Sequence, residues 1–98
     1  MKCHSLEEVR SQIDRIDNEI IKLIAERGTF VTQASGFKKS EDGVKAPGRV
    51  KRVIAKVRNK AEIYGADPDM VEALYREMIT RFTHMELEEF QKNGVPAF

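Results

Sequence analysis

The sequence predicts an all-α fold with three helices in each chain. Apolar residues recur at helical spacing in three separate segments, and residues typical of helix ends bound each segment. No segment shows the strict alternation of apolar and polar residues that indicates a half-buried strand. Helices are therefore the only regular elements that we expect.

The first predicted helix runs from Leu6 to Phe37 and carries apolar residues at alternating steps of three and four. Such a heptad stripe consists here of Leu6, Val9, Ile13, Ile16, Ile20, Leu23, Phe30, Ala34 and Phe37. Ser5 and Glu8 resemble a capping box at its start. The helix would span roughly 48 Å, whereas a compact domain of this size has a radius of gyration near ~13 Å. Either it bends sharply or it packs against a partner, and the heptad stripe favours a helical homodimer.

Two further helices are predicted downstream. The boundary residues are Gly43, Pro47, Gly65, Asp67, Pro68, Gly94 and Pro96. The second helix is expected from about Pro47 to Tyr64, because proline is favoured in a first turn and glycine just after a last turn. The third begins after Asp67, an N-cap residue followed by proline, and ends before Gly94.

Composition limits the class of protein. The 98 residues predict a single domain, 1–98, with 17 basic and 16 acidic residues, and this balance argues against a general nucleic-acid-binding protein. No apolar run is long enough to span a bilayer, and "MKCHSLEEVR" lacks the apolar block of a secretory signal, so we expect a cytoplasmic protein. The lone cysteine cannot form an internal disulfide, and no zinc-type spacing of Cys and His occurs.

Charged residues interrupt the apolar stripes. Arg27 stands between Leu23 and Phe30 in the heptad pattern, where an arginine is buried only if it meets an anion. On a continuous helix Arg27 and Lys38 project from nearly the same face, ~16 Å apart, and could enclose a small dianion. Arg10 lies ~25 Å from Arg27 and would join that site only from an antiparallel second chain.

Each of these charges also has an ordinary explanation. Arg27 would pair with an internal glutamate, Lys38 would be a lysine at a helix C-terminus, and Arg10 would be a surface residue. Glu86 lies on the apolar line of the third helix and would face solvent at a groove edge, and His84 is expected to be a surface or partner contact. Two charges that interrupt separate apolar stripes nevertheless favour a polar pocket inside a helical bundle.

The first predicted helix resembles that of the AroQ class of chorismate mutases. The resemblance rests on "LEEVRSQIDRIDNEIIKLIAERGTFVTQASGFKKS", with an arginine near its start and the motifs "IDRID", "LIAER" and "FKKS". "APGRV" and a third helix ending near Glu86 follow at similar distances, so the resemblance covers roughly residues 5–92. It implies an intertwined homodimer with two active sites and no cofactor. The implied substrate is chorismate or a relative, a cyclohexadiene dicarboxylate with an enolpyruvyl ether.

The resemblance also implies roles for individual residues. Arg27 and the partner subunit's Arg10 would bind the carboxylates, and Arg49 would assist from the second helix. Lys38 would donate to the ether oxygen, and Glu86 takes the place of a glutamine that shares that oxygen in many members. The ring would be lined by Val31, Ala34, Ile79 and Thr83.

Two positions favour one branch of the family. Mutases of this class commonly carry an acidic residue three places before the residue matching Arg49 and a glutamate directly after it, whereas this chain has Ala46 and Val50. "APGRV" is similar to the isochorismate pyruvate lyase branch, which forms salicylate and pyruvate. The alternatives are a chorismate mutase that forms prephenate and a dimeric helical module that binds a ligand without catalysis.

Glu86 departs from the common pattern. An ionised carboxylate beside the ether oxygen would repel the negative charge that develops there, so we expect Glu86 to help only when protonated. Burial among Phe82, Phe90 and Ile79 would favour the protonated form, and Lys38 nearby would oppose it. A rate that rises toward acid pH is therefore predicted.

Overall fold

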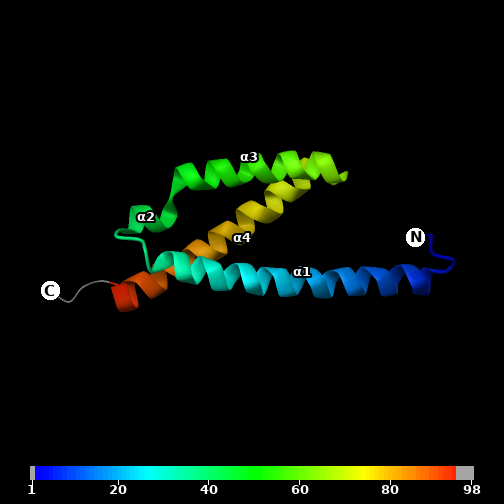
Figure 1. Ribbon diagram of the computed structural model, residues 1–98, viewed down its shortest axis with the longest axis horizontal. Helices are drawn as coiled ribbons and strands as arrows, with labels where there is room; N and C mark the ends of the chain where they lie inside the picture. Colours follow the sequence, from blue (N-terminus) through cyan, green and yellow to red (C-terminus); the bar gives the residue numbers. More distant parts are fainter. Residues whose placement is uncertain (1, 95–98) are drawn as a thin grey trace. The chain divides into compact units, whose positions relative to one another are not determined.

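The computed structural model describes residues 2–94, and every regular element in that range is helical (Figure 1). The elements are α1 (Leu6–Ser35), α2 (Glu41–Lys45), α3 (Pro47–Tyr64), α4 (Pro68–Glu89) and the π-helix η1 (Phe90–Gly94). Three long helices occupy the three predicted segments, which confirms the all-α prediction. The chain divides into two compact units, Met1–Val31 and Thr32–Phe98.

The start of α1 is capped as the sequence predicts. The Ser5 hydroxyl oxygen accepts a hydrogen bond from the Glu8 amide at 3.1 Å. The Glu8 carboxylate accepts one from the His4 amide at 2.6 Å, one residue earlier than a capping box requires. Two amide groups that would otherwise lack partners at the helix start are thereby satisfied.

The end of α1 corrects the sequence prediction. The helix stops at Ser35, two residues before Phe37, in a turn where the Phe37 amide donates to the Ala34 carbonyl at 3.0 Å. Lys38 therefore follows the helix and does not extend it. The separation of ~16 Å between Arg27 and Lys38, which assumed one continuous helix, does not apply.

The apolar stripe of α1 is exposed. No residue within Leu6–Ser35 is buried, and large side chains such as Ile13, Ile16 and Ile20 have about half of their surface in water. Most of the stability of helices in proteins comes from packing of an amphipathic face, not from helix propensity. The stripe is therefore an apolar face that the single chain leaves uncovered.

A five-residue helix, α2, lies between the first and second predicted helices, where the sequence predicts no helix. The Ser40 side chain caps it by accepting from the Gly43 amide at 3.0 Å, and Glu41 lies in its first turn. The helix packs against α4, and its Val44 is only 3% exposed. The sequence prediction missed this helix because Gly43 indicates a break between helices, whereas the cap and one buried valine stabilise a single turn.

α3 and α4 form a helical hairpin. Gly65 ends α3 with a φ of 79°, and the Asp67 carboxylate caps α4 by accepting from the Asp69 amide at 2.9 Å. Ile54 and Ala61 of α3 are each 5% exposed and form its small core. These boundaries confirm the predicted second helix and the predicted start of the third.

α4 continues into η1, which ends at Gly94 as the sequence predicts. Pro96, the other predicted stop residue, lies outside the described residues. No helix in the described range 2–94 is both long and apolar enough to cross a membrane.

Candidate functional site

Lys38 and Glu86 form an ion pair although 48 positions separate them in the chain. The Lys38 ammonium nitrogen donates to Glu86 Oε2 at 3.4 Å. The two side chains are 25% and 10% exposed, so the pair is largely shielded from water. The turn after α1 places Lys38 and the last turns of α4 place Glu86, which brings together the two residues predicted to act at the ether oxygen.

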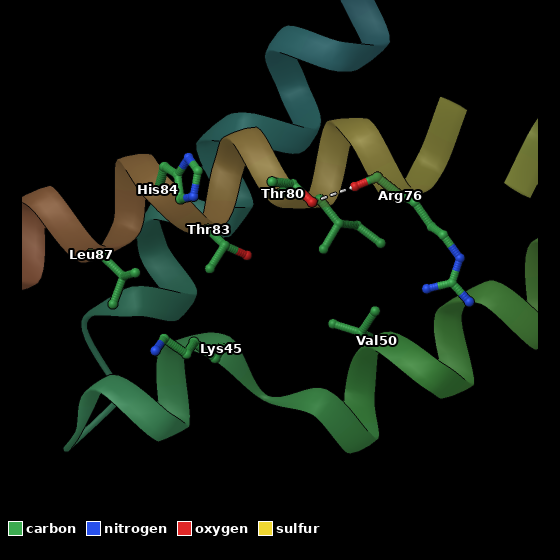
Figure 2. Close-up of a pocket in the computed structure, with 8 residues that line it drawn as sticks. Lys45, Val50, Arg76, Thr80, Thr83, His84 and Leu87 are labelled. Carbon is green, nitrogen blue, oxygen red and sulfur yellow. Dashed lines mark hydrogen bonds between the residues drawn. The ribbon is translucent and has the colours of Figure 1, made fainter. Parts of the chain in front are cut away.

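A cavity of about 390 Å³ lies beside the C-terminal half of α4 (Figure 2). It is lined by Lys45, Val50, Arg76, Ile79, Thr80, Thr83, His84 and Leu87. Val50 on α3 and Thr83 on α4 point into the space between the two helices, with Lys45 toward one end and Arg76 toward the other (Figure 2). The walls are thus partly apolar and carry a cation at each end, which suits an organic anion with a hydrocarbon ring.

Ile79 and Thr83, both predicted to line the ring, share this cavity. Lys45, Arg76 and His84 were not among the predicted site residues. The spacing of three or four residues puts Arg76 on the same face of the helix as Ile79, Thr80 and Thr83. This spacing was the signal that could have placed Arg76 beside the predicted residues Ile79 and Thr83. His84, predicted to be a surface or partner contact, is exposed and also borders the cavity.

A charge network fixes the N-terminal half of α4 against α3. The Arg58 guanidinium donates to Asp69 at 3.0 Å and to Glu72 at 2.8 Å, and Arg76 donates to the other Glu72 oxygen at 2.6 Å. The hydrogen bond from Arg76 and then the one from Arg58 lower the pKa of Glu72 below 4.5. Bonds to Asp69 and Glu72 raise the pKa of Arg58. Arg76 is therefore held at the cavity edge by a carboxylate that stays ionised at neutral pH.

The segment between Lys38 and Arg49 has a second link to the end of α4. Besides the buried Val44, the Gln91 amide donates to Glu41 at 3.1 Å. Ala46 joins α2 to α3 with a φ of 38°, in the left-handed region that residues other than glycine rarely adopt. This constrained connection sets where α3 begins, and Arg49 lies in the first turn of α3 with its side chain exposed to solvent.

The other predicted site residues lie elsewhere. Arg10, Arg27 and Val31 belong to the N-terminal unit, with Arg10 exposed and the other two partly buried. Ala34 is exposed in the last turn of α1. Their participation in the site stays a prediction.

The fold and the site together define a small all-α protein with a lysine–glutamate ion pair at the end of α4. The cavity suited to an organic anion lies along the same helix, and neither Lys38 nor Glu86 lines it. The sequence pattern of chorismate mutase type II matches residues 9–87, and the chain belongs to this family of enzymes. It is 38% identical over 77 residues to isochorismate pyruvate lyase of Pseudomonas aeruginosa, a match covering 79% of this chain and 76% of that protein. It is 32% identical over 85 residues to a bifunctional chorismate mutase/prephenate dehydratase of Aquifex aeolicus, covering 83% of this chain and 24% of that protein.

Proposed function

We propose that this chain is an isochorismate pyruvate lyase, which converts isochorismate to salicylate and pyruvate without a cofactor. The observation that carries the proposal is Val50, which lines the cavity together with Ile79 and Thr83. Mutases of this class commonly carry a glutamate at this position, and that glutamate contacts the ring hydroxyl of chorismate. Valine cannot accept that hydrogen bond, whereas isochorismate carries its hydroxyl at another ring carbon.

Similarity to the lyase of Pseudomonas aeruginosa supports the same conclusion, because it extends over three quarters or more of both chains. Ala46, which replaces the other acidic residue common in mutases, points in the same direction. Both substitutions remove a carboxylate from the start of α3, beside the cavity.

The proposed reaction needs little chemical machinery. The ether C–O bond breaks while a ring hydrogen moves to the enolpyruvyl methylene, so the ring becomes aromatic and pyruvate leaves. The protein contributes by holding a compact substrate conformation and by stabilising the negative charge that builds on the ether oxygen. Lys38 would supply this stabilisation, and its effect in the transition state is what raises the rate.

The carboxylates of the substrate require guanidinium partners. We assign this role to Arg27 and Arg49 of one chain and to Arg10 of a second copy, because paired N–H groups match a carboxylate and fix its pose. Ile79, Thr83, Val31 and Ala34 would contact the ring. Arg10 can reach this site only in a dimer, which the uncovered stripe of α1 supports. We also propose that residues 1–98 form a single domain, as the family resemblance implies.

A chorismate mutase is the second candidate function, and the similarity to the bifunctional protein of Aquifex aeolicus favours it. The deciding experiment is to assay the purified protein with isochorismate and with chorismate between about pH 5 and 8. Salicylate fluorescence reports the first reaction, and loss of chorismate absorbance reports the second. We expect salicylate to form faster by at least about tenfold, and faster formation of prephenate would reject the lyase assignment.

Lys38→Ala tests catalysis against simple ligand binding. Removing one preorganised donor to a developing oxyanion costs ~10²–10³ in kcat, so we expect that loss with the fold unchanged by circular dichroism. Lys39→Ala is the matched control, because Lys39 is the exposed neighbour of the same charge. A non-catalytic helical module would show no turnover before either substitution.

A further inference from the structure

Glu86 already accepts a hydrogen bond from the Lys38 ammonium group, which the proposed reaction needs. The Lys38 nitrogen donates to Glu86 Oε2 at 3.4 Å. Since the Glu86 side chain is only 10% exposed, water cannot readily replace the lysine as its partner. The contact also joins the turn after α1 to the end of α4, so it restrains the place of Lys38 in the fold.

The substrate and Glu86 compete for the same cation. A lysine ammonium has three donors on a compact charge, but it lies at the end of a flexible chain and follows the stronger acceptor. A carboxylate forms a stronger, charge-assisted hydrogen bond than a neutral ether oxygen does. Lys38 has enough donors to contact both groups, but its contact with Glu86 draws its charge away from the ether oxygen.

We propose that Glu86 is a positioning residue that holds Lys38 in the free protein and competes with the substrate for it. This inference deepens the proposed function and rests on it. The role differs from that of a donor to the ether oxygen, because the Glu86 carboxylate accepts a hydrogen bond from Lys38 and acts through that residue. The strength of this ion pair then sets part of the apparent affinity for the substrate.

Glu86→Gln tests the competition by steady-state kinetics. The amide keeps the shape but loses the charge, so Lys38 is released more easily and the KM for isochorismate should fall about three- to tenfold. Any change in kcat should be smaller than the fall in KM. Glu88→Gln is the matched control, because it removes the same charge two residues away from an exposed position. An unchanged KM, or a change confined to kcat, would overturn the proposal.

A second measurement needs no catalysis. The melting temperatures of Lys38→Met, Glu86→Gln and the double variant form a double-mutant cycle. Lys38→Met leaves Glu86 poorly solvated without its partner, so the double variant should melt about 2–4 °C higher than additivity predicts. The exposed residues Lys39 and Glu88, substituted in the same way, should give additive shifts.

The two measurements separate two kinds of failure. Non-additive melting temperatures without turnover of isochorismate or chorismate would confirm the Lys38–Glu86 ion pair but reject the proposed function. Turnover of isochorismate with additive melting temperatures would support the function and reject the role of Glu86.

Discussion

α1 and the α3–α4 hairpin differ in where their stability comes from. The hairpin buries Ile54 and Ala61 within the chain and ties its helices together through Arg58. α1 is the longest helix, and none of its residues is buried within Leu6–Ser35. The comparison teaches that the hairpin buries part of its apolar face within its own unit, whereas the apolar stripe of α1 contains no buried residue. The following predictions test this difference.

The largest expected effect is on α1. Ile20→Glu places a charge in the middle of the exposed apolar stripe, and a homodimer carries the substitution twice. If a second copy covers the stripe, burying these charges should destabilise the dimer by ~4 kcal/mol or more. Analytical ultracentrifugation should then show monomers, and activity should disappear because Arg10 no longer reaches the site of the other chain.

Asn18→Glu is the control for this substitution, because it introduces the same side chain at an exposed position outside the stripe. It should leave the dimer intact. A dimer that survives Ile20→Glu unchanged would show that the stripe does not form the contact between subunits.

The hairpin should respond to a smaller change inside the chain. Ile54→Ala removes three carbon atoms from its core and should lower the free energy of unfolding by ~2–4 kcal/mol. Ile63→Ala makes the same change on α3 where the side chain is 62% exposed, and should cost less than ~0.5 kcal/mol. Urea unfolding measures both, and equal losses would mean that Ile63 is covered in the assembled protein.

The network at Glu72 predicts a pH dependence. Its pKa is lowered from 4.5, so the carboxylate stabilises the fold at neutral pH and this contribution is lost as pH falls below that value. Glu72→Gln should therefore melt about 1–3 °C below the unmodified protein at pH 7, and the difference should vanish in acid. Glu77→Gln, which affects only a pair within α4, should show a smaller pH-dependent difference.

The smallest effect is expected for the substitution Ala46→Gly. Glycine relieves the left-handed backbone at φ 38° but costs more conformational entropy on folding, so Ala46→Gly should change stability by less than ~0.5 kcal/mol. Ala46→Val should cost more than ~1 kcal/mol, because a branched side chain tolerates this conformation poorly. Equal stability of the two variants would mean that Ala46 adopts an ordinary backbone conformation in solution.

The long helices could be predicted because their stripes and boundary residues agree. Pro47, Gly65 and Asp67 act locally, so their effect is visible in the sequence. The helix α2 could not be predicted from periodicity, since five residues give no repeat and only the burial of Val44 shows why it forms. Ser40 followed by the acidic Glu41 and Asp42 was the one local signal for it.

The candidate site was predictable in part. Lys38 and Glu86 were chosen from separate stretches of sequence, and the fold brings them into contact. The cations at the two ends of the cavity were missed, because Lys45 reaches it through α2 and Arg76 is directed by Glu72. Contacts that depend on packing between elements are not encoded in the spacing within one element.

The docked helix α2 has a consequence for how this chain tolerates changes of length. Surface connections usually accept inserted or deleted residues, since few contacts are lost. Here Val44, the least exposed of the buried residues, lies in α2, which is part of the connection between α1 and α3. Lys38 precedes this short helix in the chain and Arg49 follows it. One added residue would rotate Val44 by ~100° around its short helix and shift one of the two cations along the chain. The number of residues between Lys38 and Arg49 is therefore as much a part of the proposed site as the two residues themselves.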